Sequence, residues 1–214
     1  MYLYECIYIS MYSDLCLFGD VISLKFRCKE NKLLDEVKHF KWSKYNPRKD
    51  IKRHGLSITS LDGELGGMDL DSIKEYNKEH LTKYNEMSFK TFTDVYYSSS
   101  EIQKIVEPFR HNIGRSHIIR LDGGGYFPPH RDQPNYTENQ RSLRIIVPLK
   151  NCNPQNMYFM YENDVLHFEH GRAYFLNTNK MHSVFSFKES YFIVLNVEAN
   201  EEVYNIIGNH FLYS

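Results

Sequence analysis

Short apolar runs, separated by turn residues at nearly even intervals, fill the second half of this chain. They are Ser116–Leu121, Leu143–Leu149, Met157–Tyr161, Val165–Phe168, Ala173–Leu176, Ser183–Phe187 and Tyr191–Val197. Gly, Asn, Asp and Pro supply most of the turns between them. Many short strands at regular spacing are typical of a sandwich or barrel. The pattern predicts a mainly β protein with flanking helices, whose jelly-roll core spans residues 116–198.

The first 115 residues are expected to form an α+β portion that supports this core. Met1–Leu17 is apolar apart from two acids, which favours a strand or a buried segment. Further elements are expected in the order strand, helix, helix, helix, at Val21–Arg27, Asn31–Phe40, Asp69–Leu81 and Glu101–Phe109. Ser99 or Ser100 is placed to cap the last of these helices, and a closing helix is expected within residues 199–214. No linker interrupts the chain, so residues 1–214 are interpreted as a single domain.

Composition narrows the function classes. The formal net charge is −1, which gives no electrostatic case for nucleic acid or an anionic membrane as a partner. The chain has no run of 18 apolar residues and no signal-peptide pattern. Its four cysteines lack metal-binding spacing and are interpreted as free thiols. These features together predict a cytoplasmic protein.

Two histidine-x-acid pairs are candidates for metal ligands. With 10 His and 27 acidic residues, roughly one such pair is expected by chance. The sequence contains His130-x-Asp132 and His167-x-Glu169. Downstream of the first pair, His182 follows Asp132 by 50 residues. Two imidazoles and one carboxylate form the ligand set of non-haem Fe(II) oxygenases.

Spacing separates the two pairs. Four strands with their turns use roughly 44 residues, so His182 can return alongside Asp132. Residues two apart share a face in extended chain, which suits His130 and Asp132. The pair at His167 has too few residues before His182 to cross the sheet and return. The competing interpretation of the first pair is a turn histidine with Asp132 capping a loop.

The region from about Ser116 to Val197 resembles the aspartyl/asparaginyl β-hydroxylase-like branch of the 2-oxoglutarate- and Fe(II)-dependent oxygenases, which includes free-proline hydroxylases. Three segments carry the resemblance: Arg120–Asp132, Arg141–Leu149 and Glu169–Val184. Residues 1–100 resemble, more loosely, oxygenases of this type from bacterial viruses. The resemblance implies a double-stranded β-helix of cupin-like form, with Fe(II) held by His130, Asp132 and His182. It also implies 2-oxoglutarate and O2 as co-substrates, and it assigns Arg144 to a co-substrate carboxylate.

One departure from the family pattern concerns the far carboxylate of 2-oxoglutarate. Family members place an Arg about ten residues after the distal histidine, whereas this chain has none between Ser186 and Phe192. Lys188 or the Tyr191 hydroxyl is a candidate substitute, and Arg144 acting alone is the alternative.

The resulting hypothesis is a 2-oxoglutarate-dependent dioxygenase that hydroxylates an unactivated C–H bond and releases succinate and CO2. Its substrate is an amino acid, a peptide side chain or another small metabolite; oligomeric state stays open. The basic stretch Arg48–Arg53 could receive an acidic peptide or phosphate, although a solvated loop is its ordinary interpretation. Two alternatives remain: a non-catalytic jelly-roll binding module, and a cupin-type metalloenzyme that uses no 2-oxoglutarate.

Overall fold

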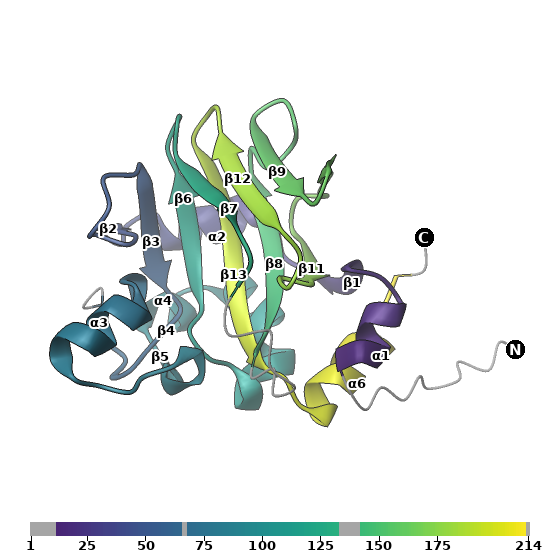
Figure 1. The fold of residues 1–214 in the computed structure, drawn as a ribbon, viewed down its shortest axis with the longest axis horizontal. Coiled ribbons are helices and arrows are strands. Elements are labelled where there is room, and N and C mark those ends of the chain that lie inside the picture. The colour runs from purple at the N-terminus through teal and green to yellow at the C-terminus, as the bar shows by residue number, and fades with distance from the viewer. Residues whose placement is uncertain (1–11, 66–67, 133–141, 213–214) are drawn as a thin grey trace, which may run out of the picture.

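The computed structural model describes residues 12–65, 68–132 and 142–212. Within these ranges most strands form two facing sheets. The larger sheet has the order β1-β11-β8-β13-β6-β3-β2 and the smaller one β10-β9-β12-β7. Figure 1 shows β7, β12 and β9 in front of the larger sheet, with α2 behind it. A short third pair joins β4 (Thr59–Ser60) to β5 (Thr91–Phe92).

The strands from β6 onward pass back and forth between the two main sheets. Those of the larger sheet are β6 (His117–Leu121), β8 (Ser142–Lys150), β11 (Arg172–Leu176) and β13 (Ser190–Glu198). Those of the smaller sheet are β7 (Tyr126–His130), β9 (Met157–Tyr161), β10 (Asp164–Val165) and β12 (His182–Ser186). This alternation is the topology of a double-stranded β-helix, so the fold class predicted from the sequence is confirmed. On the two edges of the larger sheet, the N-terminal portion adds β1 (Val21–Arg27), and β3 (Arg53–Ser57) with β2 (Ser43–Lys44).

Two apolar clusters hold these layers together, and β13 contributes to both because side chains alternate along a strand. Ile193 and Leu195 face the helices behind the larger sheet. Phe192 and Val194 face the space between the two sheets. The inner face of β13 therefore lines the interior of the barrel.

Helices cover the back of the larger sheet and its lower end. The α-helices are α1 (Tyr12–Leu17), α2 (Glu30–Val37), α3 (Ile73–His80), α4 (Asp94–Tyr97), α5 (Ser100–Val106) and α6 (Glu201–Asn209). The 3-10 helices are η1 (Met68–Leu70), η2 (Glu86–Ser88) and η3 (Glu107–Asn112). No helix in the described ranges is long and apolar enough to cross a membrane.

Several predicted boundaries were wrong. The segment Met1–Leu17 was predicted as a strand or a buried segment; its residues 12–17 form a helix in which Leu15 is buried, and the rest lies outside the described residues. The helix expected from Asp69 begins at Ile73, because the Ser72 side chain caps it by accepting the Glu75 N–H. The strand expected at Val165–Phe168 ends at Val165. Ser99 caps α5, as one of the two predicted alternatives.

Candidate metal centre

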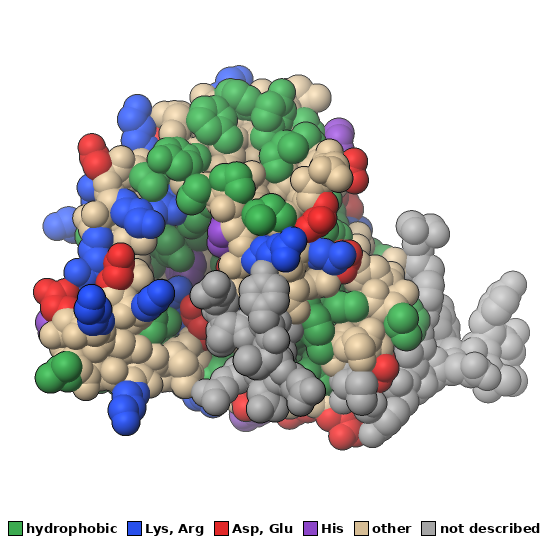
Figure 2. Space-filling view, in the orientation of Figure 1, with side chains coloured by type: hydrophobic (Ala, Val, Ile, Leu, Met, Phe, Trp, Pro, Cys, Tyr) green, Lys and Arg blue, Asp and Glu red, His purple; other side chains and the backbone are tan. Residues whose placement is uncertain are grey.

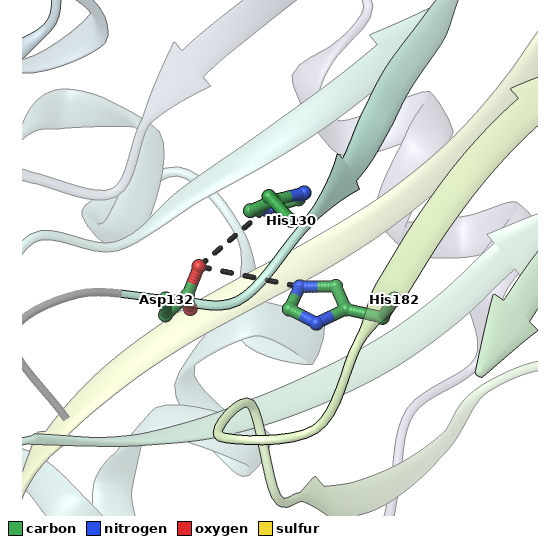
Figure 3. A group of neighbouring side chains, drawn as sticks. All are labelled: His130, Asp132 and His182. Carbon is green, nitrogen blue, oxygen red and sulfur yellow. Dashed lines mark ion pairs between the residues drawn. The ribbon is translucent and has the colours of Figure 1, made fainter. Parts of the chain in front are cut away.

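His130 and His182 are brought together by strand pairing. His130 ends β7 and His182 begins β12, and the two residues are directly opposite in the antiparallel register. Asp132 follows β7, and its backbone N–H donates to the Thr178 carbonyl at 3.0 Å. Figure 3 shows the three side chains converging from the two segments. The smaller sheet and one loop hydrogen bond therefore position all three groups.

The spacing of the three groups suits a single metal ion. One potential ligand atom from each residue lies within 4.8 Å of the others, and no further such group occurs within the described ranges. The Nε2 atoms of His130 and His182 lie 3.5 and 4.0 Å from the Asp132 carboxylate. In both rings Nδ1 lies within hydrogen-bond distance of a backbone carbonyl, that of Pro128 at 2.7 Å and that of Lys180 at 3.0 Å. These bonds place the proton on Nδ1 and leave Nε2 free to coordinate.

The charges of the three groups also favour a cation. Burial would raise the pKa of Asp132, but Arg144 and the two imidazoles outweigh it and hold the pKa well below its usual range. Burial lowers the pKa of His182, which keeps the ring neutral. For His130 burial also acts downward, but Asp132 and the Pro128 carbonyl outweigh it and raise the pKa. Metal binding needs the neutral ring, so the raised pKa of His130 makes metal binding compete with protonation of this ligand.

Arg144 lies inside the same site, on β8. Its neighbours across the sheet are Leu176 of β11 and Asn196 of β13. The Nε atom is 3.0 Å from an oxygen of Asp132, and one terminal nitrogen is 3.7 Å from Glu86. Arg144 is therefore placed to hold the carboxylate ligand as well as any anion that binds beside it.

The two other predicted co-substrate contacts lie elsewhere. Tyr191 is on the outer face of β13, where its ring packs against Trp42 at 5.5 Å and under the Lys150 ammonium. Lys188 is in the exposed turn before β13. Neither residue lines the cavity that contains the metal ligands, and Phe192 occupies the inward position instead. The geometry argues against the predicted role of both residues. The two-residue period of the strand turns Tyr191 away from the cavity, and Lys188 lies in the exposed turn outside it.

A cavity of about 190 Å³ extends from the three ligands into the barrel. At the metal end its lining includes Arg144, Arg115, Glu86, His117 and Asn196. The inner end is apolar: Ile119, Ile146, Val184, Phe192 and Val194, while the Phe159 ring stacks on the His182 ring at 6.3 Å. No lysine or arginine among the described residues lies at this inner end. The cavity is thus polar at the metal and apolar at depth.

Four of the polar lining residues were not identified from the sequence. Arg115 is buried and binds Glu86 through two bonds of 2.8 and 3.1 Å. His117 is buried, its Nδ1 has no hydrogen-bond partner in the described structure, and burial lowers its pKa well below the usual value. Alternation along the expected strand could have placed His117 beside Ile119, whereas Glu86 and Asn196 carry no sequence signal.

The competing histidine pair does not form a site. His167 and Glu169 are both exposed, and Glu169 pairs with Arg172 at 2.6 Å. His170 accepts the backbone N–H of Cys152 at 3.1 Å. Glu169 and His170 therefore have structural partners, and neither forms a metal-ligand group with His167 in the described residues.

The fold and the site together define a class: a double-stranded β-helix with two imidazoles and one carboxylate at the mouth of its cavity. No known protein-family model matches this chain, and no curated protein matches it. Solved structures do resemble it. A prolyl hydroxylase from Trichoplax adhaerens, in complex with a peptide of hypoxia inducible factor, has a TM-score of 0.49 and 14% identity, with 90% of this chain and 89% of that one covered.

Two further solved structures resemble this chain with similar TM-scores and sequence identities. A 2OG-Fe(II) oxygenase family oxidoreductase from Burkholderia pseudomallei has a TM-score of 0.48 and 11% identity, over 92% of this chain and 94% of that one. The viral collagen prolyl hydroxylase of Paramecium bursaria Chlorella virus 1 has a TM-score of 0.46 and 11% identity, over 86% and 98%. At these scores and identities the likenesses do not transfer an activity to this chain.

Proposed function

We propose that this protein is an Fe(II)- and 2-oxoglutarate-dependent oxygenase that hydroxylates an unactivated C–H bond. The observation that carries the proposal is the convergence of His130, Asp132 and His182 at the mouth of a barrel cavity, with both Nε2 atoms directed at the carboxylate. Such a ligand set leaves coordination positions open for co-substrate and O2. The products would be the hydroxylated substrate, succinate and CO2.

The residues present fit Fe(II). Two neutral imidazoles and an ionised carboxylate suit this ion, and the Nδ1 bonds to Pro128 and Lys180 fix both rings. When bound, Fe(II) and 2-oxoglutarate would supply the oxidising chemistry. The chain would hold the ion and keep Asp132 ionised through Arg144.

The fit to 2-oxoglutarate rests on the polar end of the cavity. Arg144 can bind a carboxylate there, since a guanidinium offers two parallel donors. The unpartnered Nδ1 of His117 is a further donor if the neutral ring carries its proton there. The apolar residues at depth would exclude water from the reacting atoms.

A cupin-type metalloenzyme without 2-oxoglutarate is the second candidate. Two observations favour it: Arg144 is already bonded to Asp132, and no cation lies among the described residues at the inner end of the cavity. This alternative keeps the metal and predicts that 2-oxoglutarate neither binds nor turns over.

Aerobic incubation with Fe(II) and 2-oxoglutarate, followed by a succinate assay, tests the proposal. The expected result is succinate formation that falls to background in His182→Ala, because that variant lacks one of three ligands. Mn(II) binding measured in parallel separates the candidates. Metal binding without succinate supports the cupin-type enzyme, and no metal binding contradicts both and leaves a non-catalytic module.

The substrate class in this proposal is an amino acid, a peptide side chain or a small metabolite. Mass-spectrometric screening for a product heavier by one oxygen atom would identify it. We also propose a cytoplasmic location, supported by the free thiols of Cys16, Cys28 and Cys152.

A further inference from the structure

Arg53 is a buried cation whose charge has no anionic partner among the described residues. It begins β3, directly opposite Leu121 of β6, and only 4% of the residue is exposed. Its guanidinium lies over the Phe127 ring at 4.3 Å and near the Tyr45 ring at 5.5 Å. The Nε atom is buried without a hydrogen-bond partner.

Two aromatic faces do not satisfy such a group. A guanidinium carries five N–H donors, and stacking on rings uses none of them. A buried charge without partners is strongly unfavourable, and such groups are ordinarily paired with an anion. Burial lowers the pKa of Arg53, yet a guanidinium remains charged at neutral pH. The position therefore suits an anionic ligand.

Arg53 lines a groove of about 680 Å³ that adjoins the metal cavity. The groove and the cavity share Phe127 and His130 of β7, together with Tyr45, Glu86 and Arg115. Figure 2 shows a recess with histidine atoms on this face and blue Lys and Arg side chains to its left. A molecule bound in the groove would thus lie beside a candidate metal ligand.

The charges of the groove favour an anion as well. Its acidic residues are already paired: Asp71 accepts two bonds of 3.0 Å from Arg48, and Glu86 binds Arg115. Lys49 and Lys74 are exposed in the same lining. After these pairings are counted, the described lining presents unmatched positive charge.

We propose that Arg53 binds an oxyanion, a carboxylate or phosphate, of the primary substrate in this groove. The substrate would then reach past Tyr45 and Phe127 toward the metal ligands. The oxidation of the bound substrate rests on the proposed function, whereas anion binding at Arg53 does not require oxidation. A carboxylate of 2-oxoglutarate is the other possible source of the anion.

NMR of the Zn(II)-substituted protein distinguishes these sources without any turnover. The reporter is the side-chain Nε–H resonance of Arg53, identified by its absence in Arg53→Lys. The protein is first saturated with 2-oxoglutarate and then titrated with acetate, inorganic phosphate or neutral acetamide. We expect acetate or phosphate to shift the Arg53 signal, and 2-oxoglutarate and acetamide to leave it unchanged. A shift of the Arg53 signal on addition of 2-oxoglutarate overturns the proposal. The absence of any shift with acetate and phosphate also overturns it.

Variants provide a second measurement through the backbone amides of Ile73 and Lys74, which line the same groove. Arg53→Met should weaken anion binding about 10-fold or more, while Arg53→Lys should retain part of it. The matched control is Lys41→Met, which removes one charge from an exposed position outside the groove lining. Equal weakening in Lys41→Met and Arg53→Met would reduce the effect to general charge and contradict a specific site. If the wild-type protein binds the anion but forms no succinate, the oxygenase proposal is contradicted and the anion site at Arg53 is retained.

Discussion

At the scale of single residues, the Arg144–Asp132 contact links the metal ligand to the rest of the cavity. The 3.0 Å bond orients the carboxylate and favours its ionised form. Partners that orient a ligand from the next layer typically contribute 10- to 100-fold to metal affinity. We predict that Arg144→Met weakens Mn(II) binding by about 10- to 100-fold, measured by calorimetry at neutral pH.

Arg120→Met is the control for this prediction. Arg120 is also an arginine of the larger sheet, on β6, but it pairs with Asp122 and does not line the cavity. Its loss should leave Mn(II) affinity unchanged. Unaltered affinity in Arg144→Met would show that Asp132 needs no such partner, and would leave Arg144 free for a co-substrate.

Residue-scale inference from the sequence succeeded where strand periodicity and loop length fix a position. The spacing of His130, Asp132 and His182 follows from the length of the strands between them, and the structure brings these three side chains together. Tyr191 was a candidate only through its distance from His182, and alternation along β13 puts it on the face opposite Phe192. Glu86 could not be found, because its place depends on how the N-terminal portion packs against the barrel.

At the scale of elements, Glu101 joins the start of α5 to α2. Its carboxylate is 1% exposed, accepts the Lys29 N–H at 2.9 Å, and pairs with Lys32 and Lys104 at 3.1 and 2.7 Å. Burial would raise the pKa of Glu101, but these donors outweigh it and lower the pKa to about 2. The ionised form is thus the one that stabilises the joint.

The pH dependence of the free energy of unfolding follows from the lowered pKa of Glu101. A lowered folded-state pKa gives stability that is present above the ordinary value of 4.5 and is lost as pH falls toward about 2. Glu101→Gln should cost about 2 kcal/mol at pH 7, with a smaller cost at pH 3. Urea unfolding of both proteins at the two pH values measures the difference. A cost that is the same at both values contradicts the lowered pKa; Glu202→Gln, exposed on α6, is the control.

Elements were predictable to the extent that local signals determine them. Ser99 caps α5 and Ser72 caps α3, and both caps act within three residues. The sequence pattern predicted a strand as far as Phe168, but β10 ends at Val165 because tertiary packing decides where it ends. Phe168 continues the apolar pattern but packs on Phe159 and Tyr174 from a loop, rather than from a strand.

At the scale of the whole molecule, the N-terminal portion completes the site that the barrel begins. It contributes Tyr45 and Glu86 to the metal cavity and Arg53 to the adjoining groove. The barrel alone supplies the candidate metal ligands and an apolar interior. The groove that would select a substrate thus depends on residues outside the recurring strand pattern, which explains why the sequence indicated a reaction type more readily than a substrate.

Metal binding should therefore stabilise the whole fold, because the ligands come from two strands of one sheet and a loop that leads toward the other. A ligand present at 100 times its Kd stabilises the native state by about 2.7 kcal/mol. For a chain of this size that corresponds to a rise in Tm of about 5–10 °C.

Mn(II) should produce this rise in the wild-type protein and in His39→Ala, whose histidine is exposed and distant from the site in the sequence. His182→Ala should show no rise above its own metal-free Tm. An equal rise in all three proteins would mean that Mn(II) binds elsewhere on the chain and that the His130–Asp132–His182 group is not the metal site.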